Sequence, residues 1–310
     1  MSKKLPKVVK QVWESKIKQS KSNIHVSYSQ LSSFATCKKQ WYLTYVKKLA
    51  PYQASIHAVF GTAIHETIQT WLEIVYHQTA KKGDELDLDK LLYDNLIKAY
   101  KAQKSLNGHE HFSNEDEMQM FFLDGKHILD YLRKNRRRYF SSKGWKLAGV
   151  ETLLYQELKP GVMFKGLVDL VFYHEPTDTW ELLDLKTSTS GWNSYAKKDH
   201  IKRSQLILYK EYFSKQFNIP KEKISIKFVI LKRKVPIEAE YASMQRRVQE
   251  FTPPSGKIVT GQATKMVTEF VTEAVSENTY VDKEYETSPS KNNCRWCAFR
   301  ELKICLDAVF

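Results

Sequence analysis

Two apolar runs near the middle of the chain have the pattern of paired β-strands. Residues 165–173 and 180–188 are rich in leucine, valine and aromatic residues, and residues 174–178 between them contain the proline and small polar residues of a turn. Apart from a few charged positions both runs are apolar throughout, which is typical of strands that are covered on both faces. The pattern therefore predicts a β-hairpin in the interior of the protein.

Three charged residues interrupt this hairpin. Asp169 lies in the first strand, and Asp184 and Lys186 lie in the second, where a spacing of two residues puts them on one face. A buried carboxylate without a partner is costly, so the acids require a cation or another strong partner. If Asp169 faces the same side, the oxygen-rich arrangement suits Mg²⁺ or Mn²⁺, and the lysine can assist a nucleophile. A structural Asp–Lys pair is the alternative.

Helical patterns precede and follow the hairpin. The most regular one spans residues 61–77, where apolar residues recur at helical spacing. Another helix is expected to begin near Ser27, with Ser29 as its cap, and to continue through an aromatic stripe to Tyr45. The other expected elements are two helices within 81–140, a strand at 146–158, a helix at 200–217, a strand at 223–231 and a helix at 261–276.

The length of 310 residues is sufficient for one large domain with a helical elaboration. The lysine-rich residues 1–24 are expected to form a flexible arm, and residues 25–310 a single domain. Within this domain we expect a mainly helical part, an α/β core and a C-terminal helical part, at residues 25–145, 146–235 and 236–310.

The charge balance favours a polyanionic partner. Lysine and arginine (49) outnumber aspartate and glutamate (35), for a formal net charge of +14, which suits nucleic acid, with a membrane surface as the competing partner. Five cations within residues 133–138 fit either a solvated helix end or contact with phosphates. The chain shows no apolar run of roughly 18 residues and no secretory signal. We therefore expect a soluble protein of the cytoplasm, or of the host-cell cytoplasm if a phage encodes it.

Other residues with metal-binding side chains lie outside the hairpin. His65 lies beside the apolar stripe of its helix, where a histidine is usually a boundary residue without a ligand role. Glu151 lies on the strand before the hairpin, and a single glutamate there is weak support for a metal site. Four thiols in an intracellular protein favour a metal over disulfides, and both Zn²⁺ and an iron–sulfur cluster are open. The four cysteines are Cys37, Cys294, Cys297 and Cys305.

Five separated motifs, in one order along the chain, together resemble the PD-(D/E)XK nucleases of the RecB-like branch. The hairpin motif has two parts, similar to G-x-x-D and D-x-K-T. The helix before the hairpin carries a segment similar to G-x-x-x-H, and the helix after it carries one similar to Q-x-x-x-Y. The segments are Cys37, residues 61–65, residues 166–169 with 184–187, residues 205–209, and the C-terminal cysteines. The resemblance covers almost the whole chain, from about residue 27 to residue 305.

This resemblance implies a fold and an activity. The fold would be an α/β nuclease core with a mixed central sheet, flanking helices and a helical N-terminal elaboration. The activity would be metal-dependent hydrolysis of DNA, by an exonuclease on single-stranded or frayed ends. Lys186 would assist the attacking water, Gln205 would position that lysine or the substrate, and Tyr209 would line the DNA path. The residues that would bind the Mg²⁺ or Mn²⁺ ion are His65, Asp169, Asp184 and, through its carbonyl, Leu185.

The cysteines resemble those of AddB-type and CRISPR-associated RecB-like exonucleases, in which a [4Fe–4S] cluster ties the two ends of the chain together. The gap of seven residues between Cys297 and Cys305 is longer than usual in those proteins, and Zn²⁺ at the same thiols is the alternative. The expected partners are DNA and either a homo-oligomer or a recombination or CRISPR complex. A DNA-binding subunit with an inactive, structural metal site and a nuclease directed at RNA stay open as other functions.

Overall fold

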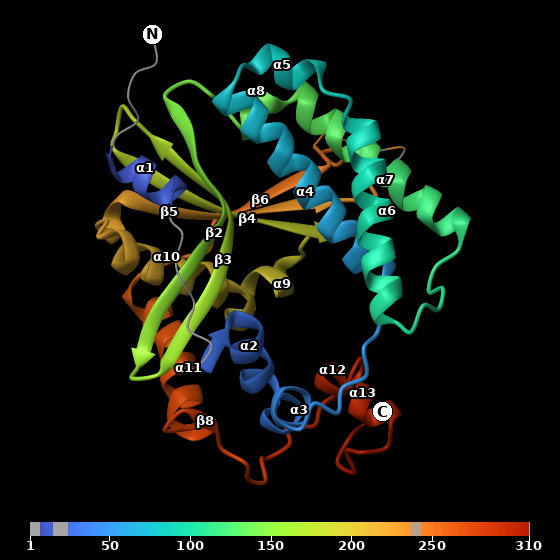
Figure 1. Ribbon diagram of the computed structural model, residues 1–310, viewed down its shortest axis with the longest axis vertical. Helices are drawn as coiled ribbons and strands as arrows, with labels where there is room; N and C mark the ends of the chain where they lie inside the picture. Colours follow the sequence, from blue (N-terminus) through green and yellow to red (C-terminus); the bar gives the residue numbers. More distant parts are fainter. Residues whose placement is uncertain (1–6, 15–23, 237, 239–240, 242, 310) are drawn as a thin grey trace.

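The computed structural model describes residues 7–14, 24–236, 238, 241 and 243–309 (Figure 1). In this part of the chain, six strands form one mixed sheet with the order β1-β3-β4-β5-β6, and β2 pairs with β3 beside this path. The expected α/β class with a mixed central sheet is confirmed, and the predicted hairpin is β3 with β4. The strands of this sheet are β1 (Ile24–Ser27), β2 (Trp145–Lys159), β3 (Val162–His174), β4 (Thr179–Ser188), β5 (Ile224–Lys232) and β6 (Val248–Phe251).

The strand directions place several chain segments at one end of the sheet. Short turns join β2 to β3 and β3 to β4, so these pairs are antiparallel, whereas β4 and β5 are parallel and are connected through helix α10 (His200–Phe217). β1 lies parallel to the first residues of β3, and β6 lies antiparallel to β5. The C-terminal ends of β4 and β5 and the N-terminus of α10 therefore lie at the same end of the sheet.

Helices cover both faces of the sheet (Figure 1). One apolar cluster joins the sheet to α2, α10 and α11, and the other joins it to α4, α6 and α7. Along β4 the side chains alternate between the two clusters, Leu182 in the first and Leu183 in the second, so the hairpin is buried on both faces as its composition predicts. The helices before the sheet's β2 are α1 (Lys7–Trp13), α2 (Tyr28–Thr36), α3 (Lys38–Trp41), the π-helix η1 (Tyr42–Val46), α4 (Ile56–His77), α5 (Ala80–Glu85), α6 (Leu88–Leu106), α7 (Glu115–Lys134) and α8 (Arg136–Tyr139).

The later elements include a strand that the sequence did not indicate. The segment 236–310 was expected to be helical, but β6 within it pairs with β5 and extends the sheet. The remaining elements are α9 (Ser194–Lys198), η2 (Lys221–Lys223), α11 (Lys257–Ala274), β7 (Val275–Ser276), β8 (Thr279–Tyr280), α12 (Lys291–Cys294) and α13 (Ala298–Glu301).

The helix predicted from Ser27 to Tyr45 is interrupted. Its cap is Ser27 rather than Ser29, because the Ser27 hydroxyl accepts a hydrogen bond from the Gln30 N–H at 3.3 Å. The helix ends at Cys37, whose backbone is extended (φ −159°, ψ 111°), and the chain continues as α3 and the π-helix η1. Cys37 therefore lies at a break between two helices, and an aromatic stripe in the sequence does not reveal such a break.

The lysine-rich segment 1–24 is described only in part. Residues 7–13 form α1, and Val9 and Val12 in this helix are buried in the cluster that contains α10, so this part packs on the domain instead of extending as an arm. The rest of the expected arm, residues 1–6 and 15–23, lies outside the described residues. None of the helices in the described ranges is both long enough and apolar enough to cross a membrane.

Candidate active site

The site lies where β4 separates from β3. The two strands pair from His174 with Thr179 to Leu170 with Leu183, and beyond that point the next partner of β3 on this side is β1. Asp169 is the first residue past the last pair, and its Oδ2 accepts a hydrogen bond from the Leu185 N–H at 2.6 Å. The carboxylate thus takes the place of a ladder partner for β4 and holds the two strands at the point of their separation.

The side-chain alternation of β3 also changes at this point. Val168 and Val171 both belong to the cluster on the α10 side, although an unbroken strand would place residues three apart on opposite faces. On the neighbouring strand Glu151, opposite Asp169 between two paired positions, has a positive φ of 47°, which is unfavourable for a residue with a side chain. The strands are therefore locally distorted around Asp169.

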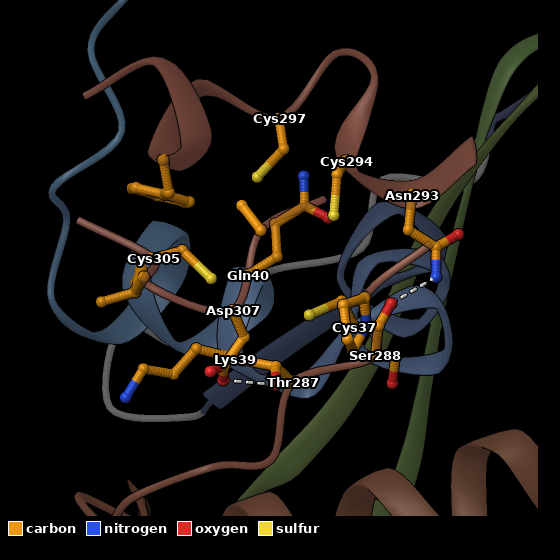
Figure 2. A pocket seen from close by; sticks show the side chains of 14 residues that line it. Cys37, Lys39, Gln40, Thr287, Ser288, Asn293, Cys294, Cys297, Cys305 and Asp307 are labelled. Carbon is orange, nitrogen blue, oxygen red and sulfur yellow. Dashed lines mark hydrogen bonds between the residues drawn. The ribbon is translucent and has the colours of Figure 1, made fainter. Parts of the chain in front are cut away.

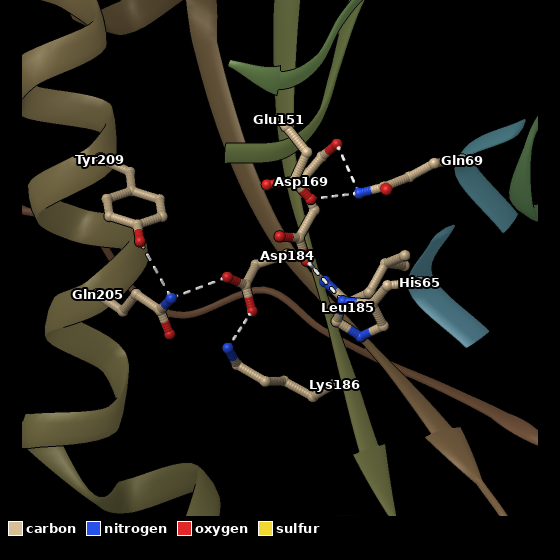
Figure 3. A network of polar contacts seen from close by, with 9 residues as sticks. All are labelled: His65, Gln69, Glu151, Asp169, Asp184, Leu185, Lys186, Gln205 and Tyr209. Carbon is tan, nitrogen blue, oxygen red and sulfur yellow. Dashed lines mark hydrogen bonds and ion pairs between the residues drawn. The ribbon is translucent and has the colours of Figure 1, made fainter. Parts of the chain in front are cut away.

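A chain of polar contacts leads from α10 to the lysine on β4 (Figure 3). Gln205 donates its amide hydrogens to Asp184 Oδ1 at 2.9 Å and to the Tyr209 hydroxyl at 3.3 Å. Asp184 is 1% exposed, and its Oδ2 lies 2.7 Å from the Lys186 ammonium. Asp184 and Lys186 share a face of the sheet, as their spacing predicts. Gln205 contacts the site through its hydrogen bond to Asp184, although its position on a helix surface alone would suggest that it is exposed.

Tyr209 depends on a glycine of the hairpin. A Cβ atom at Gly166 would lie 2.8 Å from Cε1 of Tyr209 and 3.0 Å from Cε1 of Phe164, both of them buried rings. Any larger residue at this position would displace the tyrosine that contacts Gln205. This close approach explains physically why a glycine stands three residues before Asp169.

His65 approaches the carboxylates from the opposite side, on α4 (Figure 3). Its Nδ1 lies 3.7 Å from Asp169 Oδ2, and its Nε2 is buried and has no hydrogen-bond partner among the described residues. Burial, reinforced by the positive charge of Lys186, lowers the pKa of His65 to about 3. The imidazole is therefore neutral at pH 7, with a lone pair free to bind a cation.

The positive charge around the two aspartates is not sufficient to compensate for their burial. Burial, followed by the charge of Asp184, raises the pKa of Asp169 well above its ordinary value, and burial raises the pKa of Asp184 despite its contact with Lys186. Two buried carboxylates beside a neutral histidine are ligands that a divalent cation can bind. Within the described residues no three histidine, cysteine or acidic side chains stand at the mutual spacing of a metal site.

Gln69 belongs to this site and was missed in the sequence. It lies one helical turn after His65, is 6% exposed, and donates to Glu151 Oε1 at 2.6 Å and, weakly, to the Asp169 carbonyl at 3.5 Å. Glu151 is thereby held beside Asp169, where its charge further raises the pKa of Asp169. The only available signal was the i, i+4 spacing from His65, which places both side chains on one helix face.

The cysteines form a separate pocket (Figure 2). All four are free thiols, and their side chains line one small cavity together with Gln40, Leu43 and Phe299. Figure 2 shows the Gln40 side chain lying among the sulfur atoms. No three of the described thiols are close enough together to hold a metal ion. Burial raises the pKa of the Cys305 thiol. Four converging thiols fit a four-thiolate metal group in chemistry, provided that Gln40 moves aside.

Hydrogen bonds to backbone carbonyls join the N-terminal and C-terminal segments beside this pocket. The Lys39 N–H donates to the Glu286 carbonyl at 3.1 Å, and the Asn293 side chain donates to the Thr36 carbonyl at 3.2 Å. The predicted association of Cys37 with the C-terminal cysteines therefore holds at the level of the pocket.

Comparison with known proteins identifies one family over almost the whole chain. A sequence model of the PD-(D/E)XK nuclease superfamily matches residues 25–305. A crystal structure described as a "putative exonuclease" from Eubacterium rectale is similar to this chain, with 14% identity, a TM-score of 0.44, and coverage of 81% of this chain and 83% of that one. No curated protein matches the chain in sequence.

Proposed function

This chain belongs to the PD-(D/E)XK nuclease superfamily, and we propose that it is a divalent-metal-dependent exonuclease that hydrolyses single-stranded or frayed DNA ends. The observation that carries the proposal is the meeting of Asp169, Asp184 and Lys186 with Gln205 and His65, which come from β3, β4, α10 and α4. These residues lie far apart in sequence, and structural ion pairing alone does not require their convergence.

The chemistry of each side chain suggests its role in this reaction. His65, Asp169, Asp184 and the Leu185 carbonyl would bind Mg²⁺ or Mn²⁺, and a bound ion lowers the pKa of water and neutralises charge on a phosphate oxygen. Lys186 donates a hydrogen bond to the attacking water or to the oxygen on which charge develops. Gln205 keeps Asp184 in place, and Tyr209 keeps Gln205 in place.

Incubation with end-labelled DNA tests the proposed function. We expect the purified protein to degrade single-stranded DNA when Mn²⁺ or Mg²⁺ is present, and to stop when EDTA is added, because the buried carboxylates need a cation to act. Labels at either end will show the polarity, and RNA of the same sequence serves as the comparison substrate. Failure to cut any nucleic acid with either ion would contradict the proposal and favour the DNA-binding subunit with a structural site.

We further infer that the cysteine pocket binds a [4Fe–4S] cluster, with Zn²⁺ as the alternative. The support is the convergence of Cys37 from near the N-terminus with Cys294, Cys297 and Cys305 on one cavity. A metal that joins residue 37 to residue 294 closes a very long loop, which restricts the unfolded chain. Such a clamp would hold α2 and α3 against the C-terminal segment.

Replacing Cys297 by serine tests this pocket. After anaerobic purification we expect the wild-type protein to contain iron and to absorb visible light, and Cys297→Ser to lose most of both and to melt at a lower temperature, because one strong ligand is gone. The matched control replaces Thr287, a half-buried pocket-lining residue, by alanine, and it should keep the metal. A colourless wild-type protein that contains stoichiometric zinc would establish the alternative, and one without any metal would contradict both.

A further inference from the structure

The loop between β4, which carries Lys186, and α10, which carries Gln205, is held in place by more contacts than is usual for a surface loop. Residues 189–199 begin directly after β4, which carries Lys186, and end at α10, which carries Gln205, so both ends are fixed to residues of the site. Ser188 exchanges hydrogen bonds with the backbone of Gly191 at 3.0 and 3.1 Å. This turn requires glycine, since φ at Gly191 is +102°.

A glutamine on β6 fixes the middle of the segment. Gln249 accepts a hydrogen bond from the Trp192 N–H at 2.7 Å and donates one to the Trp192 carbonyl at 3.1 Å. The Trp192 ring packs against Phe228 and Phe251, with centroid distances of 5.0 and 6.2 Å. The segment is therefore held to the sheet by both its backbone and its side chain, which limits the motion of the short helix α9 after it.

Helix α9 carries an exposed aromatic residue. Its Tyr195 is 83% exposed, more than any other tyrosine of the described chain, and its ring has no aromatic or hydrogen-bond partner there. Asn193 caps α9 by accepting from the Ala196 N–H at 2.9 Å, and Asp199 caps α10 in the same way, so the backbone on either side of the ring is ordered. An ordered but uncovered ring leaves apolar surface in water that a ligand can cover.

Three lysines lie close to Tyr195 along the chain. Lys197 and Lys198 follow it on α9 and make no ion pair within the described residues. Lys202, in the first turn of α10, lies 6.0 Å from the Trp192 ring and pairs with Asp199 at 4.0 Å. Aromatic rings combined with cations are the groups that bind single-stranded nucleic acid, because an unpaired base offers a free face for stacking while phosphates attract the lysines. Bases inside a duplex are already stacked and do not offer that face.

We propose that Tyr195 is a stacking platform for an unpaired base of the DNA strand in the active site, with Lys197 and Lys198 on its phosphates. The inference rests on the proposed function and adds to it a residue that selects single-stranded over duplex DNA. Figure 1 shows α9 beside the C-terminal end of β4 and next to α10. Lys186 lies two residues before that end of β4.

Binding by a cleavage-deficient protein tests this proposal separately from catalysis. In a Lys186→Ala background, the affinities for a fluorescent oligothymidylate and for a blunt DNA hairpin of equal length are measured by fluorescence anisotropy with Mg²⁺. We expect Tyr195→Ala to weaken oligothymidylate binding about tenfold and to change hairpin binding by less than about twofold. Tyr195→Phe keeps the ring and should bind within about twofold of the parent. Tyr93→Ala, at another exposed tyrosine on α6, is the matched control and should leave both affinities unchanged.

Several outcomes overturn the inference. Unchanged oligothymidylate affinity in Tyr195→Ala, an equal loss on the hairpin, or an equal loss in Tyr195→Phe would each show that the ring does not stack on an unpaired base. The two proposals fail differently. If the wild-type protein cuts no DNA but Tyr195→Ala still loses single-strand binding, the nuclease function fails and the platform stands. If the wild-type protein cuts DNA but binding is indifferent to Tyr195, only the platform fails.

Discussion

Replacing Lys186 by alanine is expected to lower the rate of DNA cleavage by about a thousandfold while leaving DNA affinity within a few-fold. Its ammonium lies 2.7 Å from Asp184 Oδ2, and its charge partly offsets the burial that raises the pKa of Asp169. The substitution therefore removes the donor that stabilises developing charge, whereas contacts along the rest of the strand persist. Initial cleavage rates at saturating DNA, with affinity measured in parallel, separate the two effects.

A second lysine on the sheet provides the control for this experiment. Lys227 on β5 is half-buried, as Lys186 is, and it pairs with Glu181 and Glu250 on the neighbouring strands, so Lys227→Ala also breaks half-buried ion pairs. We expect it to reduce the melting temperature but to preserve the cleavage rate of the folded protein. Wild-type cleavage by Lys186→Ala would refute the assignment of the active site, and equal losses in both variants would point to a general effect of destabilisation.

The hairpin that organises the site could be predicted because its signals are local. Two apolar runs around a proline-containing turn specify β3 and β4, and the spacing of Asp184 and Lys186 specifies a shared face. The helix that carries His65 was also evident, although it begins at Ile56 rather than at residue 61. A strong periodicity over a long run favours the same element in any tertiary context, so these elements could be predicted without knowledge of the fold.

The details that complete the site depend on tertiary contacts and left little trace in the sequence. Glu151 adopts a positive φ without being glycine, and only the surrounding sheet can impose that conformation. Gln69 is an ordinary polar residue on an amphipathic helix until β2 and β3 are placed beside it. Gln205 and Tyr209 could be assigned only through their resemblance to a known motif, because residues on a helix alone do not show what they face.

The cysteine pocket shows the same distinction. The resemblance to AddB-type and CRISPR-associated exonucleases suggested that Cys37 joins the C-terminal group, and the shared cavity supports that association. The interruption of the helix at Cys37 and the position of Gln40 among the thiols follow from packing of the two chain ends and could not be derived from spacing.

Replacing Asp169 by asparagine is expected to abolish cleavage and, without divalent cations, to stabilise the fold. Burial and the charge of Asp184 raise the pKa of Asp169, which means that the folded state disfavours the ionised form. Stability from this group is thus present at acid pH and is lost as the pH rises through its raised pKa. The amide is neutral at every pH, and its oxygen can still accept the Leu185 N–H, so the advantage of the variant should grow with pH and reach about 2 °C or more in melting temperature near neutrality.

Divalent cations should reverse this order of stability, so that the wild-type protein melts at a higher temperature than Asp169→Asn. An ion that binds only the folded state raises its stability with concentration, so Mn²⁺ or Mg²⁺ should raise the melting temperature of the wild-type protein and have little effect on Asp169→Asn, which lacks a charged ligand. Asp178→Asn is the control of opposite sign, because hydrogen bonds from Lys223 and Tyr173 lower the pKa of Asp178, so its neutralisation should slightly destabilise the fold and leave the response to cations intact. Equal stabilisation of the wild-type protein and Asp169→Asn by the ions, measured by thermal melting with and without EDTA, would place the cation elsewhere. A metal-free Asp169→Asn less stable than the wild type at neutral pH would show that the carboxylate serves the fold, and the site would then be structural rather than catalytic.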